Sequence, residues 1–187
     1  MREDEAVREA ISEVGMPAAA DEAGVTAATQ LVFTEGPAVD ADGSVYFADI
    51  ANDRIMKLAA GGELSVFRQP AGRTNGQTFD GRGRLLHCEG AEMGPGGGRR
   101  IARTNLATGE YVVLTAEYEG LPYNSPNDIC VDGRGRIYFT DPCYSGRERM
   151  RMDVEGVYRI DLDGAGERAT SVTRVLDNAV VERPNGI

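Results

Sequence analysis

The fold of this chain is decided by residues 123–142, which read Tyr-Asn-Ser-Pro-Asn-Asp-Ile-Cys-Val-Asp-Gly-Arg-Gly-Arg-Ile-Tyr-Phe-Thr-Asp-Pro. The apolar run Ile129–Val131 predicts a short strand, and the β-branched and aromatic run at residues 137–140 predicts a second one. Residues 132–135 between them have the Asp and Gly residues of a tight turn. Pro142 ends the second strand because proline has no N–H for the ladder. The stretch therefore predicts a β-hairpin.

The same pattern occurs twice upstream, with the same spacing. Three polar residues mark each copy, and they are separated by five and then nine residues: Glu35, Asp40 and Asp49; Asn75, Asp80 and Glu89; Asn127, Asp132 and Asp141. A fourth copy begins at residues 184–187. Repetition at fixed intervals predicts a fold built from repeated units.

Two further apolar runs follow each hairpin, separated by a Gly-containing turn. Residues 55–58, 101–104 and 157–160 are the predicted third strands, and residues 64–67, 111–114 and 172–176 the predicted fourth strands. Four strands per unit, repeating every 40 to 60 residues or so, are typical of a β-propeller. Because one four-stranded unit cannot bury both of its faces, we expect an all-β fold of antiparallel blades stacked around an axis.

The length of the chain fits only part of a propeller. Closed propellers need roughly 4 to 8 blades of about 40 to 45 residues, whereas residues 31–187 hold about three and a half. We therefore interpret this region as a partial β-propeller, from a longer parent or a truncated gene product. The alternatives are a small open β-domain and a propeller completed by a second copy. Apolar residues at helical spacing predict a short helix or a mobile arm within residues 1–30.

Composition and charge exclude several classes of partner. The formal net charge is −10, with 30 acidic and 20 basic residues, whereas nucleic-acid binding needs a basic surface. No apolar run is long enough to span a bilayer, and residues 1–6 do not begin a secretory signal. The three cysteines, an odd number without Cys-x-x-Cys spacing, favour a reducing compartment. We therefore expect a cytoplasmic protein without nucleic-acid or membrane partners, and the oligomeric state stays open.

Other reactive residues have ordinary structural explanations. His87 is the single histidine, and its place in a predicted strand favours a structural or supporting role over catalysis. Cys143 is an alternative nucleophile, but no histidine lies near it in the sequence. Residues 94–98 form a Gly-rich insert without the strand and helix of a phosphate-binding loop, which favours a flexible loop. We expect hydrogen bonds between blades from the carboxylates that end the second strands: Asp49, Glu89 and Asp141.

One polar residue recurs just before each predicted first strand: Glu35, Asn75, Asn127 and Asn185. Because the first strand of each propeller blade lines the central channel, these side chains are expected to converge at one end of that channel. A carboxylate with several amides offers hard oxygen ligands, which suit Ca²⁺ or Mg²⁺ better than Zn²⁺ or copper. The alternative is that these residues only cap turns.

Five motifs, in this order, resemble the SMP-30/gluconolactonase/LRE-like family. They are Phe-Thr-Glu-Gly-Pro at 33–37, Asn-Gly-Gln-Thr-Phe-Asp at 75–80, Asn-Ser-Pro-Asn-Asp at 124–128, Tyr-Phe-Thr-Asp-Pro at 138–142 and Arg-Pro-Asn-Gly-Ile at 183–187. The resemblance runs from about residue 31 to the last residue. It implies a six-bladed propeller that hydrolyses lactones or related cyclic esters with one divalent cation in its channel.

The resemblance also implies roles for residues. Glu35 and Asn185 would be metal ligands, Asn127 a ligand or a substrate contact, and Asn75 a substrate contact. The cation is usually Ca²⁺ in the family, with Mg²⁺, Mn²⁺ and Zn²⁺ as alternatives. The catalytic Asp expected from a later blade lies beyond Ile187, so no catalytic residue is named, and we expect this stretch alone to be weakly active or inactive.

The chain departs from the family in its second blade. Many gluconolactonase-like members have Cys-Glu-His-Gly there, whereas residues 88–91 read Cys-Glu-Gly-Ala. The family's substrate choice is therefore not carried over. The leading hypothesis is a metal-dependent hydrolase of sugar lactones, in which the cation polarises the ester carbonyl. The alternative is a non-catalytic ligand-binding or scaffolding propeller with a structural cation, because the fold does not decide function.

Overall fold

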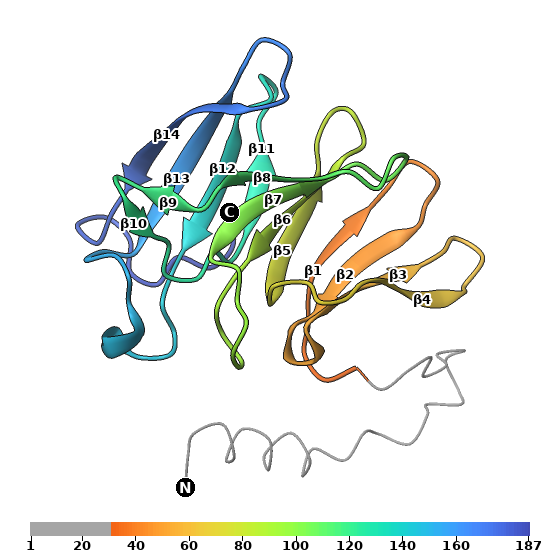
Figure 1. The fold of residues 1–187 in the computed structure, drawn as a ribbon, viewed down its shortest axis with the longest axis horizontal. Helices are drawn as coiled ribbons and strands as arrows, with labels where there is room; N and C mark the ends of the chain where they lie inside the picture. The colour runs from red at the N-terminus through yellow and green to blue at the C-terminus, as the bar shows by residue number, and fades with distance from the viewer. Residues whose placement is uncertain (1–30) are drawn as a thin grey trace, which may run out of the picture.

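The computed structural model describes residues 31–187, which form three four-stranded antiparallel sheets (Figure 1). Blade 1 contains β1 (Thr34–Val39), β2 (Val45–Asp49), β3 (Arg54–Leu58) and β4 (Leu64–Arg68). Blade 2 contains β5 (Thr74–Phe79), β6 (Leu85–Glu89), β7 (Arg100–Thr104) and β8 (Tyr111–Thr115). Blade 3 contains β11 (Ile129–Val131), β12 (Ile137–Asp141), β13 (Gly156–Leu162) and β14 (Ala169–Leu176). Strands adjacent in sequence pair within each blade, which confirms the predicted propeller architecture.

Short elements that the repeat did not predict lie in the connections. β9 (Glu117–Tyr118) and β10 (Leu121–Pro122) pair as a small hairpin between blades 2 and 3. Single 3₁₀ turns, η1 (Ile50–Asn52) and η2 (Arg147–Arg149), lie between the second and third strands of blades 1 and 3. The helix or arm predicted for residues 1–30 falls outside the described residues. In the described part of the chain, no helix has the length and hydropathy needed to cross a bilayer.

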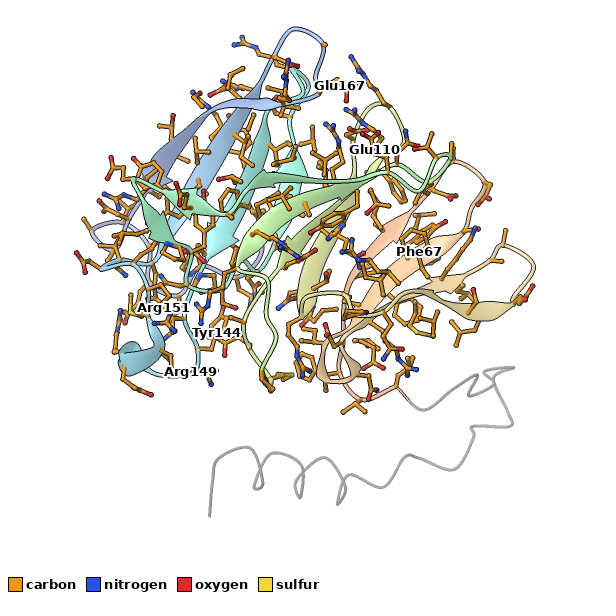
Figure 2. The ribbon with its side chains drawn as sticks, viewed as in Figure 1. Phe67, Glu110, Tyr144, Arg149, Arg151 and Glu167 are labelled. Atoms are coloured by element: carbon orange, nitrogen blue, oxygen red, sulfur yellow. The ribbon has the colours of Figure 1, made fainter. Side chains whose placement is uncertain are left out.

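The two ends of the blades differ in their connections. Figure 2 shows Glu110 and Glu167, from tight turns, at one end, and Tyr144 and Arg149, from a long loop, at the other. At the turn end, Glu167 of blade 3 forms ion pairs with Arg84 and Arg103 of blade 2, at 2.8 and 3.0 Å. We call this the turn end and the opposite one the loop end. The ion pairs join blades 2 and 3 at the turn end.

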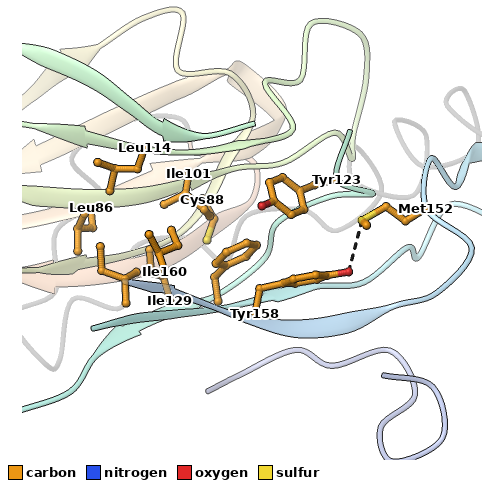
Figure 3. Close-up of a cluster of buried hydrophobic side chains, with 11 residues drawn as sticks. Leu86, Cys88, Ile101, Leu114, Tyr123, Ile129, Met152, Tyr158 and Ile160 are labelled. Carbon is orange, nitrogen blue, oxygen red and sulfur yellow. Dashed lines mark hydrogen bonds between the residues drawn. The ribbon is translucent and has the colours of Figure 1, made fainter. Parts of the chain in front are cut away.

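Apolar layers between neighbouring blades form the core. One cluster joins blades 2 and 3 (Figure 3): Leu86, Cys88, Ile101, Leu114, Tyr123, Ile129, Ile137, Phe139, Met152, Tyr158 and Ile160. Its aromatic rings pack with centroids 5.1 to 5.5 Å apart, a favourable range for such pairs. A second cluster joins blades 1 and 2: Ala38, Tyr46, Ile55, Ala71 and Leu85. Each blade therefore buries apolar side chains against its neighbour, as the repeat predicted.

Glycines let the first strands of neighbouring blades approach closely at the loop end. A Cβ atom at Gly36 of β1 would lie 2.7 Å from Gly76 Cα and 2.8 Å from Gln77 N of β5. A Cβ atom at Gly76 would lie 2.5 Å from Asp128 Oδ1 and 2.6 Å from the Asn127 carbonyl oxygen. Such distances are shorter than any side chain tolerates, so packing of the first strands requires glycine at both positions.

Replacing Gly76 by alanine should destabilise the protein, because the added methyl group overlaps the backbone before β11. Overpacking of this kind costs about 1 to 3 kcal/mol in the free energy of unfolding. Chemical denaturation measures the effect. Gly81→Ala is the matched control, since a Cβ atom there meets nothing within 4 Å. Equal stability of the two variants would show that the first strands can separate at no cost.

Candidate functional site

The predicted site residues lie at irregular positions of the first strands. The β1–β2 register shifts between Glu35 and Ala38, and the β5–β6 register shifts between Thr74 and Gln77. Glu35 and Asn75 therefore lie inside strands, not just before them as predicted. The sequence did not reveal this because a β-bulge continues the ladder with one extra residue. Asn127 lies two residues before β11, and its N–H donates to the Thr140 carbonyl at 2.9 Å.

The backbone places the four residues along one continuous rim. Gly36, which follows Glu35, contacts the Asn75 carbonyl oxygen through its close approach to β5. The Asn127 carbonyl accepts a hydrogen bond from Gly76 N at 2.6 Å. The Asn185 carbonyl accepts one from Thr140 Oγ1 at 2.8 Å. The positions that the repeat aligned are thus neighbours at the loop end, one blade after another. Their roles as ligands stay a prediction.

The side-chain oxygens at this rim make no hydrogen bonds or ion pairs within the described part of the chain. The Glu35 carboxylate is exposed, and neither it nor the amides of Asn75 and Asn127 has a hydrogen bond or ion pair with another residue of 31–187. Asn127 is only 6% exposed. Asn185 uses its amide nitrogen, which donates to Tyr144 Oη at 2.9 Å. A carboxylate and amide oxygens therefore remain for an oxygen-seeking cation.

Two polar residues beside the rim were not predicted. Gln77 donates through Nε2 to the Gly36 carbonyl at 3.2 Å, while its buried Oε1 has no hydrogen-bond partner in the described part of the protein. Asp128 occupies the position that is glycine in the other copies, and its Oδ2 accepts a hydrogen bond from Ile187 N at 3.1 Å. That exception to the glycine pattern was the signal available in the sequence. Among residues 31–187, no three His, Cys, Asp or Glu side chains gather as a metal cluster.

The recurring carboxylates at the ends of the second strands are structural. Asp141 accepts hydrogen bonds from Asn124 N and Ser125 N at 2.8 and 2.7 Å, and burial raises its pKa to about 7. Asp49 holds the segment before β1 in the same way, through Val32 N and Phe33 N at 3.2 Å. Both bind the segment that enters their own blade, so the predicted bonds between blades are wrong for these two.

Glu89 alone of the three carboxylates forms a contact between blades. It accepts hydrogen bonds from Tyr111 Oη at 2.8 Å and Arg100 Nε at 2.6 Å within blade 2. Arg68 of blade 1 lies 3.5 Å away. The contacts of Asp49, Glu89 and Asp141 involve none of the four rim residues. We therefore do not include these carboxylates in the candidate site.

Residues 33–187 match the SMP-30/Gluconolactonase/LRE-like region. The chain belongs to this family. A gluconolactonase from Zymomonas mobilis is 28% identical over 174 residues, which cover 86% of this chain and 46% of that protein. The chain thus spans about half the length of this relative.

Solved structures agree with the fold. A gluconolactonase from Xanthomonas campestris superposes with a TM-score of 0.66 at 29% identity, over 79% of this chain and 48% of that one. Regucalcin from Agrobacterium tumefaciens, a calcium-binding protein, gives a TM-score of 0.57 at 21% identity, over 81% of this chain and 45% of that one. The likeness to regucalcin supports the fold alone. The Xanthomonas campestris gluconolactonase resembles this chain in both sequence and fold.

Residues 88–91, which differ from the Cys-Glu-His-Gly motif noted above, lie in a crowded part of the structure. A Cβ atom at Gly90 would lie 3.0 Å from Ser125 Oγ and 3.3 Å from the Arg73 carbonyl oxygen, so a larger side chain would be tightly confined there. The insert that follows is a loop, as predicted, but hydrogen bonds hold it. Gly98 N donates to the Gly72 carbonyl at 3.0 Å, and Arg73 Nε donates to the Pro95 carbonyl at 3.1 Å.

His87 and Cys143 are enclosed groups with structural contacts. His87 is fully buried, with Nε2 3.1 Å from Thr104 Oγ1. Burial, reinforced by Arg68 and Arg100, lowers its pKa to about 3. The Cys143 thiol donates to the Gly146 carbonyl at 3.4 Å, and burial raises its pKa. Neither a protonated imidazole nor a thiolate is therefore available near neutral pH. All three cysteines are free thiols.

Since His87 is the only histidine, its protonation can be followed directly by proton NMR. In the folded protein we expect its ring resonances to stay constant from pH 8 to pH 5. In denaturant the same resonances should shift near pH 6.5. The pKa of His87 is lower in the folded than in the unfolded state. Its contribution to the free energy of unfolding is therefore present above pH 6.5 and is lost as the pH falls towards 3. A folded-state midpoint between pH 6 and 7 would contradict the buried, neutral imidazole.

Proposed function

We propose that this chain forms part of a metal-dependent hydrolase that opens sugar lactones or related cyclic esters. The observation that supports it most directly is the rim at the loop end, where Glu35, Asn75, Asn127 and Asn185 follow one another on neighbouring backbone segments. Membership of the SMP-30/Gluconolactonase/LRE-like family and likeness to gluconolactonases supply the reaction class. The activity of the whole protein is part of the proposal, because the chain spans about half of its relatives.

The residues present fit a hard divalent cation, for which we propose Ca²⁺. Glu35, Asn127 and Asn185 would hold it through one carboxylate and two amide oxygens. When bound, such a cation polarises an ester carbonyl and stabilises the negative charge that develops on its oxygen. As a cation ligand Glu35 has its carboxylate oxygens engaged, so we do not assign it as the general base.

The protein contributes positioning of the ligands and of the substrate. Asn127 is buried, and its backbone is fixed on both sides by hydrogen bonds to Gly76 and Thr140. The position of its Cα atom is therefore fixed before a cation binds. Asn75 is half-buried on the neighbouring strand and can donate its amide N–H to a substrate oxygen. We assign Asn75 to substrate contact and Asn127 to the cation, with a substrate contact as its alternative role.

Calcium titration of the chain by isothermal calorimetry tests this assignment. Glu35→Gln keeps the shape of the side chain but removes the charge, so Ca²⁺ affinity should fall by about tenfold or more. Glu63→Gln is the matched control, since exposed Glu63 lies in the β3–β4 turn at the turn end of the same blade. Wild-type affinity in Glu35→Gln would remove Glu35 from the cation site.

The reaction is tested on the complete gene product that carries this sequence. Opening of aldonolactones releases acid, and a pH-stat follows it with and without EDTA. We expect chelation to abolish the activity and added Ca²⁺ to restore it. Hydrolysis unaffected by both EDTA and Glu35→Gln would refute the metal-dependent mechanism, and absence of hydrolysis with retained Ca²⁺ binding would favour a structural cation.

A further inference from the structure

A series of hydrogen bonds connects the β6–β7 loop of blade 2, which contains the Gly-rich insert, with Asn185. Glu92, two residues before the insert, accepts a hydrogen bond from Tyr144 N at 3.2 Å through Oε1, and from the Ser145 hydroxyl through Oε2. Tyr144 Oη in turn accepts the Asn185 amide N–H at 2.9 Å. Figure 2 shows Tyr144 at the loop end of blade 3, in the connection between β12 and β13. Three separate segments of the chain therefore meet at Tyr144.

The hydroxyl of Tyr144 determines how the Asn185 amide is oriented. A phenol has one proton to donate, and Tyr144 Oη donates it to the Arg183 carbonyl at 3.4 Å. The oxygen then faces Asn185 as an acceptor, so the group pointing at it must be the amide NH₂. Asn185 Oδ1 is consequently turned away from Tyr144.

Orientation matters for Asn185 because nothing else holds this side chain within residues 31–187. Asn185 is exposed, and its remaining hydrogen bond is made by its backbone carbonyl. A free amide can rotate by half a turn and present its NH₂ group, which repels a cation, in place of its oxygen. Groups that fix a ligand's orientation typically contribute 10- to 100-fold to metal affinity.

We propose that Tyr144 is a positioning residue for the cation site, because its hydroxyl holds the Asn185 amide with Oδ1 directed towards the cation. This inference rests on the proposed function, in which Asn185 is a ligand. Glu92, from the neighbouring blade, supports it by binding the backbone N–H of Tyr144 and the hydroxyl of Ser145. The loop that contains the insert of blade 2 is thereby connected to the rim, although it supplies no ligand itself.

Calcium affinity of the chain, measured by calorimetry in two backgrounds, tests the proposal. Tyr144→Phe removes only the hydroxyl and should weaken Ca²⁺ binding by about tenfold. In an Asn185→Asp background, the two carboxylate oxygens are equivalent and need no such orientation. There, Tyr144→Phe should change the affinity by less than about twofold, so the two substitutions are coupled. Tyr138→Phe on β12 is the control for removal of a tyrosine hydroxyl.

The outcomes separate this inference from the proposed function. If the wild-type chain binds no Ca²⁺, both fall. If it binds and Tyr144→Phe binds equally well, only the positioning role is refuted. An equal loss in the wild-type and Asn185→Asp backgrounds also refutes it, because a general structural defect would act in both. The thermal midpoint of the metal-free protein, expected to be unchanged in Tyr144→Phe, shows whether the variant is folded.

Discussion

The close approach of successive first strands is the constraint on which the rest of this structure depends. Gly36 and Gly76 bring backbone against backbone, with no space for a methyl group between the blades. Such contact leaves no freedom in how far apart neighbouring first strands lie. Polar side chains next to these glycines, Glu35 and Asn75, are therefore held at fixed positions on one rim. The candidate site is a consequence of packing the blades around an axis.

The two ends of the blades differ in their contacts. At the turn end, Glu167 joins blade 3 to Arg84 and Arg103 of blade 2, and the apolar layers fill the space between the sheets. These contacts add to the packing of the first strands at the loop end. Side chains such as Glu35 and Asn127 make no hydrogen bonds or ion pairs with other residues of 31–187.

The sequence predicted the blades well because their signals are local. Apolar and β-branched runs separated by Gly turns indicated four strands in each blade, and the repeat implied the first strands of blades 1 and 2. It did not place Glu35 and Asn75 inside their strands, because a bulge is set by pairing with the next strand. It also missed Tyr144 and Glu92, whose contact joins positions 52 residues apart. A unique pair of this kind has no repeat to reveal it.

The repeat and the exceptions to it therefore carry different information. Positions that recur, such as the glycines after Glu35 and Asn75, describe how neighbouring blades pack. Positions that break the pattern show where this chain differs from its own repeat. Asp128 replaces the glycine and meets the backbone of Ile187, and Gly90 and the following insert replace a motif usual in the family. Both exceptions border the same rim. Asp128, and Gly90 with the insert that follows it, are thus the parts of the candidate site that the repeated blade pattern does not explain.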